Sequence, residues 1–405
     1  MAEQTSVKFF TYDMLRMPSV VPNNLSSIRD LLRFCLVNGS PEVAVTSATV
    51  TAGVCRMTVA AGNAFSFQSV VLCSGFDQAG ANGEHRVTTT SDLWFEFETD
   101  LPDGPLSGTA MNAKYAPAGW MEPFAADSTT MVIRSKNTNP ESRRYFLQIK
   151  ETTYQYIQVR AFKTMTDLNN GLIPIPTTAQ NPNGYYWAKS FENNANPRAW
   201  FIIASDKFFY YGINNYYTLS IDLVPFMGCF GDFVTDNVND KYNVVLRGGI
   251  TISDATSMSI SGYDFGCSHI TPHASISISG SPSTGDNPLS GMFYANVPNW
   301  NGSYGLSGAN QFGMINPSTG GYNLFRYNIV DTLMNPRGYL PGVLYVGNNL
   351  QTSGSFYSLN KGTGDFENKY LFGTYTPGSA GGYFHYTISQ SNPSYMFFDI
   401  TGPWE

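Results

Sequence analysis

The strongest periodic signal in the chain is a single helix near its N-terminus. Between residues 24 and 38, apolar side chains recur at the spacing of one helix face. They are Leu25, Ile28, Leu31, Leu32, Cys35 and Leu36. Ser27, with an acid three residues later, resembles a capping box, and Asn24 and Ser26 are alternative N-caps. Gly39 supplies a left-handed stop. We expect this helix to bury one face against β-structure.

Short alternating runs of apolar and polar residues follow the helix and predict β-strands. From about residue 43 to 98, five runs are separated by Gly, Asn and Asp turns. They are VAVTSATVTAG, VCRMTVAAG, FSFQSVVLC, EHRVTTT and DLWFEFE. Asn82 and Gly83 stand just before one run and predict a local hairpin. The strands fit a small antiparallel barrel or sandwich, inserted between two parts of the main fold.

The rest of the chain also has a β-pattern, interrupted by stretches rich in proline. SRRYFLQIKE, YQYIQVRAF and part of RAWFIIASDKFFYYGI alternate large apolar and polar residues, so we expect each to present one face to a core. LPDGPLSGTAMNAKYAPAGWMEPF indicates a looped connector, and GLIPIPTTAQNPNGYYW is too rich in proline for a regular element. About 140 residues at the end mix Gly, Ser and Asn with aromatics, which favours ordered β-loops over disorder.

These patterns predict a mainly β protein, built from antiparallel sandwich or barrel-type domains with one short N-terminal helix and long ordered loops. We expect residues 1–42 to form an extended segment and helix that belong to the main domain. Residues 43–102 would form the small inserted antiparallel β module. Residues 103–405 would form the main β-rich domain, with a division near residue 250 as an alternative. No period of about 20–50 residues occurs, so a propeller or solenoid is not predicted.

The composition favours a protein that assembles with others. Charged residues make up 13% of the chain and aromatic residues 15%, so the surface must be built largely from uncharged polar groups, which suit polar interfaces. A formal net charge of -7 gives no basic face, so we expect no nucleic acid as a partner. No run of about 18 apolar residues and no secretion signal occur, so we expect no membrane span and synthesis in a cytoplasm.

Cysteine and histidine offer one cluster of candidate metal ligands. Cys267, His269 and His273 stand together in CSHITPH and could bind zinc in principle. Pro272 breaks helical spacing, and no fourth ligand is evident because the nearest acids, at positions 264 and 286, are typical loop residues. We therefore predict no metal-binding residue and no cofactor. The odd, scattered set of cysteines is expected as buried thiols outside any disulfide. They are Cys35, Cys55, Cys73, Cys229 and Cys267.

No arrangement typical of a catalytic site is evident. The chain has 30 acids, but nothing singles out a pair for glycoside hydrolysis. Glu96 and Glu98 fall on the same face of one strand, where we expect them to meet solvent. There is no GxSxG elbow and no phosphate-binding or dinucleotide glycine motif, and the 4 histidines are scattered. We therefore predict no catalytic residue, no cofactor-binding residue and no enzymatic activity.

Aromatic residues beside Asn and Gly form further segments of interest, namely NPNGYYWAK, NNYYTL and VPNWNGSYG. Such side chains can fill a core, anchor a subunit interface or line a glycan-binding surface. In a β-rich chain of this size, we expect the core to take most of them.

A distributed set of longer segments forms a recognisable pattern along the chain. The segments are KFFTYDMLRMPSV, LLRFCLVNG, GEHRVT, KYAPAGWMEPF, RRYFLQI, YIQVRAFKTMTD, NPNGYYWAKS, RGYLPGVLYVG and the terminal FFDITGPW. Together they resemble a family of structural proteins from tailed-bacteriophage virions. The resemblance covers both ends and most of the middle of the chain, and it includes no catalytic signature.

The resemblance implies a virion structural protein, assembled in the cytoplasm of the bacterial host. The inserted module is similar to small β-domains that phages attach to tail, baseplate and fibre proteins. This favours a multi-copy peripheral tail or baseplate component. Its expected partners are other virion structural proteins and further copies of itself, as a homo-oligomer. Alternatives are a capsid decoration or head-fibre protein, a receptor-binding adsorption protein that contacts host surface glycan, and a tailspike-like depolymerase.

Overall fold

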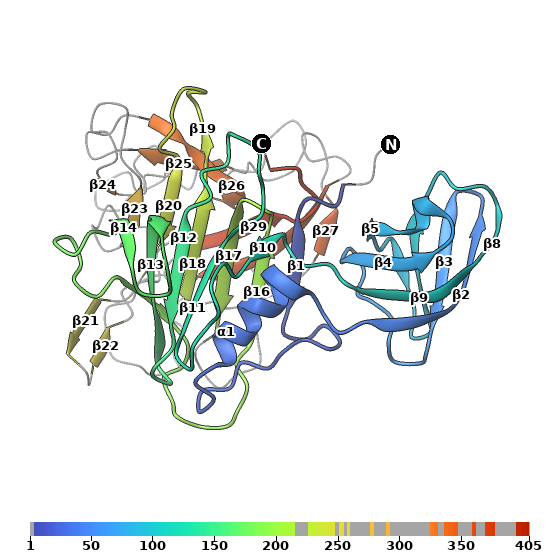
Figure 1. Cartoon of the computed structure of the whole chain (residues 1–405), viewed down its shortest axis with the longest axis horizontal. Helices are drawn as coiled ribbons and strands as arrows, with labels where there is room; N and C mark the ends of the chain where they lie inside the picture. The colour runs from blue at the N-terminus through green and yellow to red at the C-terminus, as the bar shows by residue number, and fades with distance from the viewer. Residues whose placement is uncertain are drawn as a thin grey trace, which may run out of the picture.

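The computed structural model describes residues 4–214, 226–247, 251–254, 257–259, 276–278, 289–291, 325–330, 336–346, 359–361, 369–376 and 394–404. The described part of the chain is mainly β, and its strands pair antiparallel. Its helical structure is one short N-terminal helix and a 3-10 turn, η2 (Ala79–Ala81). The predicted fold class is therefore confirmed. Figure 1 shows a large body and a smaller lobe beside it.

The N-terminal helix confirms the predicted one. α1 (Ser27–Leu32) continues into a π-helical segment, η1 (Arg33–Asn38), which ends at Gly39 with a φ of 75°. Ser26, one of the alternatives, is the N-cap, and its Oγ donates to Asp30 Oδ2 at 2.7 Å. The predicted apolar face is buried apart from Leu25, which is 44% exposed.

A seven-stranded sheet, called here the central sheet, forms the middle layer of the body. Its strands, in spatial order, are β1 (Lys8–Thr11), β16 (Trp200–Ala204), β17 (Phe208–Ile213), β18 (Phe226–Asp232), β20 (Val244–Arg247), β23 (Ile276–Ile278) and β24 (Leu289–Gly291). β1 comes from the start of the chain, so the N-terminal segment is part of the body.

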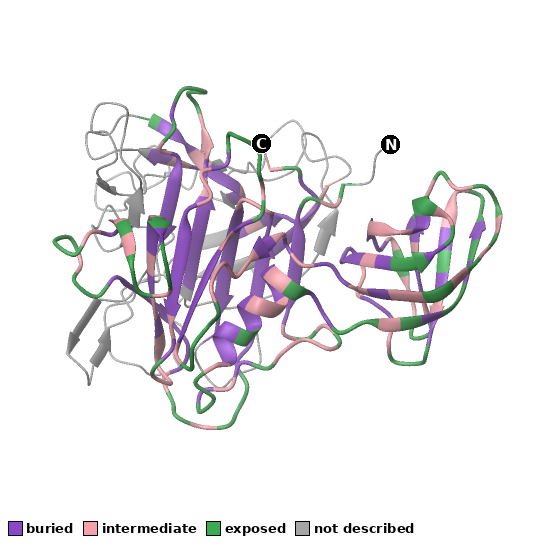
Figure 2. Ribbon diagram, in the orientation of Figure 1, coloured by how far each residue is buried: buried purple, intermediate pink, exposed green. Residues whose placement is uncertain are grey.

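Both faces of the central sheet are buried along β1, β16, β17, β18 and β20 (Figure 2). Alternate strand residues point to opposite faces. Phe201 and Tyr210 therefore join one apolar core, while Ile202 and Tyr211 join the other. Every residue of β16 and β17 is buried. The prediction that RAWFIIASDKFFYYGI presents one face to a core is therefore wrong, because a sheet covers each side.

Two six-stranded sheets provide these outer layers. The first, called here the flanking sheet, contains β10 (Trp120–Met121), β11 (Thr130–Ser135), β12 (Phe146–Lys150), β13 (Tyr156–Met165), β14 (Gly171–Ile175) and β15 (Tyr185–Ala188). The second contains β19 (Val234–Thr235), β25 (Phe325–Val330), β26 (Pro336–Val346), β27 (Leu359–Lys361), β28 (Tyr370–Thr376) and β29 (Ser394–Asp399). A separate pair is β21 (Thr251–Asp254) with β22 (Ser257–Ser259).

Aromatic contacts hold the three layers together. Trp187 of the flanking sheet stacks on Tyr211 of the central sheet, with ring centroids 5.5 Å apart. On the opposite face, Phe398 lies 5.0 Å from Tyr210 and 5.5 Å from Phe201. The body is therefore a three-layer β-structure with an apolar core on each face of the central sheet.

The smaller lobe is an eight-stranded sheet, called here the small sheet. Its strands are β2 (Val43–Thr51), β3 (Val54–Val59), β4 (Val70–Phe76), β5 (Gly83–Arg86), β6 (Thr89–Thr90), β7 (Trp94–Glu98), β8 (Gly104–Leu106) and β9 (Gly108–Tyr115). The predicted hairpin at Asn82 is present as β4–β5, and the Asn82 side chain closes its loop on the backbone of Phe76. Because β9 pairs with β4, this sheet extends to residue 115.

Two segments predicted to be irregular contain strands. The expected connector holds β8, β9 and β10, and the proline-rich run holds β14 and β15. Both predictions are wrong for the same reason: pairing with a distant strand overrides weak local propensity. Pro174 is tolerated because β14 pairs on one side with β13 and leaves its other side at the edge of the sheet.

We predict that Gly228→Ala destabilises the body. A Cβ at Gly228 of β18 would lie 2.5 Å from Trp187 Cε2, inside the core between the central and flanking sheets. Such overpacking costs about 1–3 kcal/mol of unfolding free energy, which urea denaturation would measure. Gly80→Ala is the control, since its Cβ would meet the flexible side chain of Leu101 at 3.1 Å. Equal stability of the two variants would contradict the layer contact.

Candidate functional site

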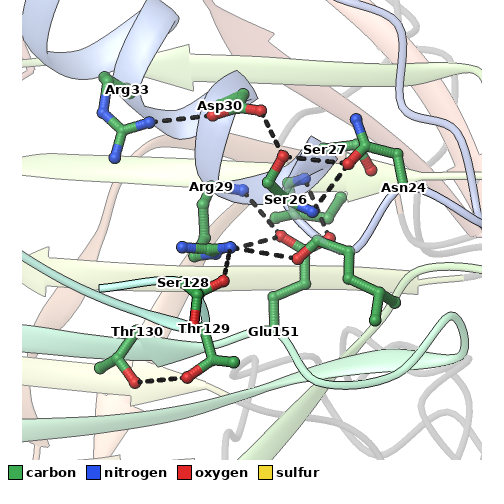
Figure 3. Close-up of polar contacts among 12 residues, drawn as sticks. Asn24, Ser26, Ser27, Arg29, Asp30, Arg33, Ser128, Thr129, Thr130 and Glu151 are labelled. Carbon is green, nitrogen blue, oxygen red and sulfur yellow. Dashed lines mark hydrogen bonds and ion pairs between the residues drawn. The ribbon is translucent and has the colours of Figure 1, made fainter. Parts of the chain in front are cut away.

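A buried carboxylate, Glu151, lies where α1 meets the flanking sheet (Figure 3). It directly follows β12 and has no solvent exposure. Its two oxygens accept backbone N–H groups of the first helical turn, Ile28 N at 3.3 Å and Arg29 N at 3.1 Å. These donors have no partner within the helix, so Glu151 caps α1 from 122 residues away.

Two cations neutralise this carboxylate. Lys189 Nζ, just after β15, donates to Glu151 Oε1 at 2.7 Å, and Arg29 Nε lies 3.7 Å from Oε2. Burial lowers the pKa of Lys189, and the charge of Glu151 opposes that shift. Lys189 also donates to the backbone carbonyl of Asn24 at 2.6 Å. We call Glu151, Lys189 and Arg29 the Glu151 network.

Arg29 extends the network to the loop before β11. Its guanidinium donates to the backbone carbonyls of Asp127 at 3.0 Å, Ser128 at 2.6 Å and Leu25 at 3.3 Å. Asp127 in turn accepts backbone N–H groups of residues 129 and 130, which lowers the pKa of its carboxyl. The Glu151 carboxylate already accepts hydrogen bonds from protein donors, so the geometry suits fixing the helix to the sheet.

A second polar cluster joins the small sheet to the body. Arg86 of β5 is 6% exposed and donates to four backbone carbonyls. The acceptors are Gln4 at 2.8 Å, Gln68 at 2.8 Å, Val7 at 3.0 Å and Thr401 at 3.2 Å. One side chain of the small sheet thus binds both terminal segments of the described chain.

Arg16 lies in the body and contacts the loop between β3 and β4 of the small sheet. Its Nη1 donates to the carbonyl of Asn63 at 2.8 Å, and its guanidinium lies 4.5 Å from the ring centroid of Phe65. Burial lowers the pKa of Arg16. Lys8 and Glu84 add an ion pair of 2.7 Å. We call Arg86, Arg16 and this pair the arginine joint. Its contacts from both sides fix the small sheet on the body.

The structure describes four of the five cysteines but not the candidate metal ligands of the CSHITPH segment. Four cysteines are buried and form no disulfide, as predicted, namely Cys35, Cys55, Cys73 and Cys229. The CSHITPH segment, with Cys267, His269 and His273, lies outside the described residues. Within the described ranges, no group of three or more His, Cys, Asp or Glu side chains could hold a metal ion.

The two strand carboxylates and the aromatic segments are also placed. Glu96 and Glu98 share the outer face of β7, where Glu98 is exposed and Glu96 pairs with Arg56 at 2.7 Å. In NPNGYYWAK both tyrosines and Trp187 are buried, so this segment contributes to the core. VPNWNGSYG lies outside the described residues, as does NNYYTL after its first residue.

No family model matches the chain, and no curated protein matches it. None of the helices in the described part of the chain is long and apolar enough to cross a membrane.

We predict that Glu151→Gln strongly destabilises the protein. The amide keeps the shape but leaves Lys189 and Arg29 as buried positive charges, which costs about 3–5 kcal/mol of unfolding free energy. Denaturant unfolding at pH 7 measures this. Glu122→Gln is the matched control, because its ion pair with Arg33 is partly exposed and contributes about 1 kcal/mol or less. Similar losses in both variants would contradict the role of the Glu151 network.

We predict that Arg86→Gln loosens the small sheet and both terminal segments together. The shorter side chain leaves buried carbonyls unsatisfied, at a cost of about 1–3 kcal/mol. Hydrogen exchange should therefore rise in residues 4–11 and 396–404 and at the contacting edge of the small sheet. Arg56→Gln, on the exposed face of the same sheet, is the control. Unchanged exchange in the terminal segments would show that Arg86 does not hold the arginine joint.

Proposed function

We propose that this chain is a structural subunit of a tailed-bacteriophage virion, a multi-copy peripheral tail or baseplate component that acts by assembly. The observation that carries the proposal is the small sheet, which projects from the three-layer body (Figure 1) and is fixed there by the arginine joint. A lobe held in one orientation can bind a neighbour without the entropic cost of ordering a flexible linker.

The composition and the distributed resemblance support the same proposal. With 13% charged residues, the chain has a surface of mainly uncharged polar groups, which suits polar interfaces. In a symmetric particle, many modest contacts add up, so no single interface needs high affinity. The Glu151 network and the arginine joint hold parts of the fold in place and require no substrate.

The experiment is localisation of the chain on intact phage particles. Gold-labelled antibody raised against the purified chain should bind at the tail end of the particle, and antibody pre-absorbed with the chain should not. Label over the head would overturn the tail position and favour a capsid decoration or head-fibre protein. Absence of the chain from denatured, purified particles on immunoblots would overturn the virion assignment itself.

A further inference from the structure

The outer face of the flanking sheet carries an apolar cluster that faces away from the central sheet. The strand register places Arg134, Phe146, Phe162 and Pro174 in one row across β11, β12, β13 and β14. Phe146 and Phe162 are each 7% exposed and pack with the buried Val132 and Met165, and half-buried Phe124 and Leu168 pack against them. Leu172 extends the cluster on β14 and is 70% exposed. We call Arg134, Phe146, Phe162 and Leu172, with these neighbours, the outer patch.

Arg134 gives the outer patch a cationic centre. Its guanidinium carbon lies 4.4 Å from the ring centroid of Phe146. Its Nε is buried and donates no hydrogen bond within the described structure. Burial lowers the pKa of Arg134, and the nearby charge of Arg144 adds to that shift. Arg134 as a whole is partly exposed, so its guanidinium can still meet an incoming carboxylate, the anion that a guanidinium binds best.

The segment of the chain around the outer patch also carries a net positive charge. Residues 116–190 contain eight Lys and Arg against five Asp and Glu, and among these the fully buried Lys189 and Glu151 neutralise each other. Arg160 and Lys150 lie on the same outer face as Arg134, one and two rows away from it. The chain as a whole has a net charge of -7, so this positive face differs from the rest of the molecule.

The far end of the small sheet has the opposite charge. The chain enters this sheet at Val43 and leaves it at Tyr115, so the far end holds the β2–β3 turn and the segment from 98 to 104. Four exposed carboxylates gather there, which we call the acidic tip. They are Asp77, Glu98, Asp100 and Asp103. Residues 43–115 contain seven Asp and Glu against three Lys and Arg, and one of those bases is the buried Arg86.

We infer that the acidic tip of one copy docks on the outer patch of a second copy of this chain. The occupant follows from charge complementarity, since one chain carries both a negative tip and a positive, partly apolar face. Figure 1 places β14 and the small sheet at opposite ends of the molecule, so the two surfaces meet between copies. Two different surfaces make a heterologous contact, which builds a ring or a linear array.

This inference rests on the proposed multi-copy function and deepens it, because it names the surfaces through which copies meet. Exposed Leu172, with half-buried Phe124 and Leu168, supplies the apolar area that docking removes from water, and the charges select the orientation. Contact through one tip is small, so we expect a dissociation constant of about 10 μM to 1 mM. The association should weaken with salt, because 1 M salt shortens the Debye length to about 3 Å.

The experiment uses two reciprocal variants of the full-length chain. Arg134→Glu reverses the outer patch, and the double change Glu98→Lys with Asp100→Lys reverses the acidic tip. Leu172→Asp is a second patch variant at a mostly exposed position, which keeps the test decisive if Arg134→Glu fails to fold. Lys241→Glu and the double change Glu42→Lys with Asp236→Lys are controls, since they make the same charge changes at exposed positions elsewhere. Sedimentation velocity at low salt measures association.

The expected result is concentration-dependent association of the wild type and both controls beyond the dimer. Each reciprocal variant alone should associate at least about tenfold more weakly. A mixture of the tip variant with a patch variant keeps one intact tip and one intact patch, so it should associate more strongly than either variant alone.

Two results would overturn the docking. One is a wild type that remains monomeric up to about 1 mM, the weak end of the range expected for this contact. The other is association that both reciprocal variants retain. Either result leaves the virion assignment untouched, because that assignment depends on the presence of the chain in particles. Conversely, association that follows these variants in a chain absent from virions would refute the proposed function alone.

Discussion

Burial of the central sheet on both faces is the constraint on which the rest of the structure depends. β1, β16, β17, β18 and β20 of this sheet offer apolar side chains alternately to two cores, so two further layers must cover it. The flanking sheet and α1 cover one face, and the sheet formed by β19 and β25–β29 covers the other. The aromatic-rich composition follows from this need, because large rings such as Trp187 and Phe398 bridge the layers.

An apolar core on each face of the central sheet leaves little room for charged side chains. Most buried charged residues therefore lie at the ends of strands and in the adjoining loops. Glu151 follows β12 and Lys189 follows β15. On the opposite side of the central sheet, Arg337 and Asp240 form a buried pair with Nε and Oδ2 2.9 Å apart. Burial of such pairs costs desolvation free energy, so their main effect is to select one arrangement of loops and layers.

The sequence revealed those features that depend on neighbours along the chain. The helix was predictable because its apolar period and Gly39 are local signals, and the β4–β5 hairpin was predictable from Asn82 and Gly83. β9 and β15 were not predictable, since their stability comes from pairing with β4 and β13. The Glu151 network was missed for a related reason. A carboxylate that caps a helix 122 residues earlier leaves no spacing that a local pattern could reveal.

The contact of Arg86 with Thr401 has a consequence for how the chain folds during synthesis. All pairings of the small sheet lie within residues 43–115, so this sheet can form as soon as that segment leaves the ribosome. The body can fold only later, because β1 pairs with β16 almost 200 residues further along the chain. The arginine joint also includes the hydrogen bond from Arg86 to Thr401, so it cannot be complete until the last residues are synthesised. Contacts of such long sequence separation form slowly. The small sheet should therefore exist as a folded unit before the body that holds it.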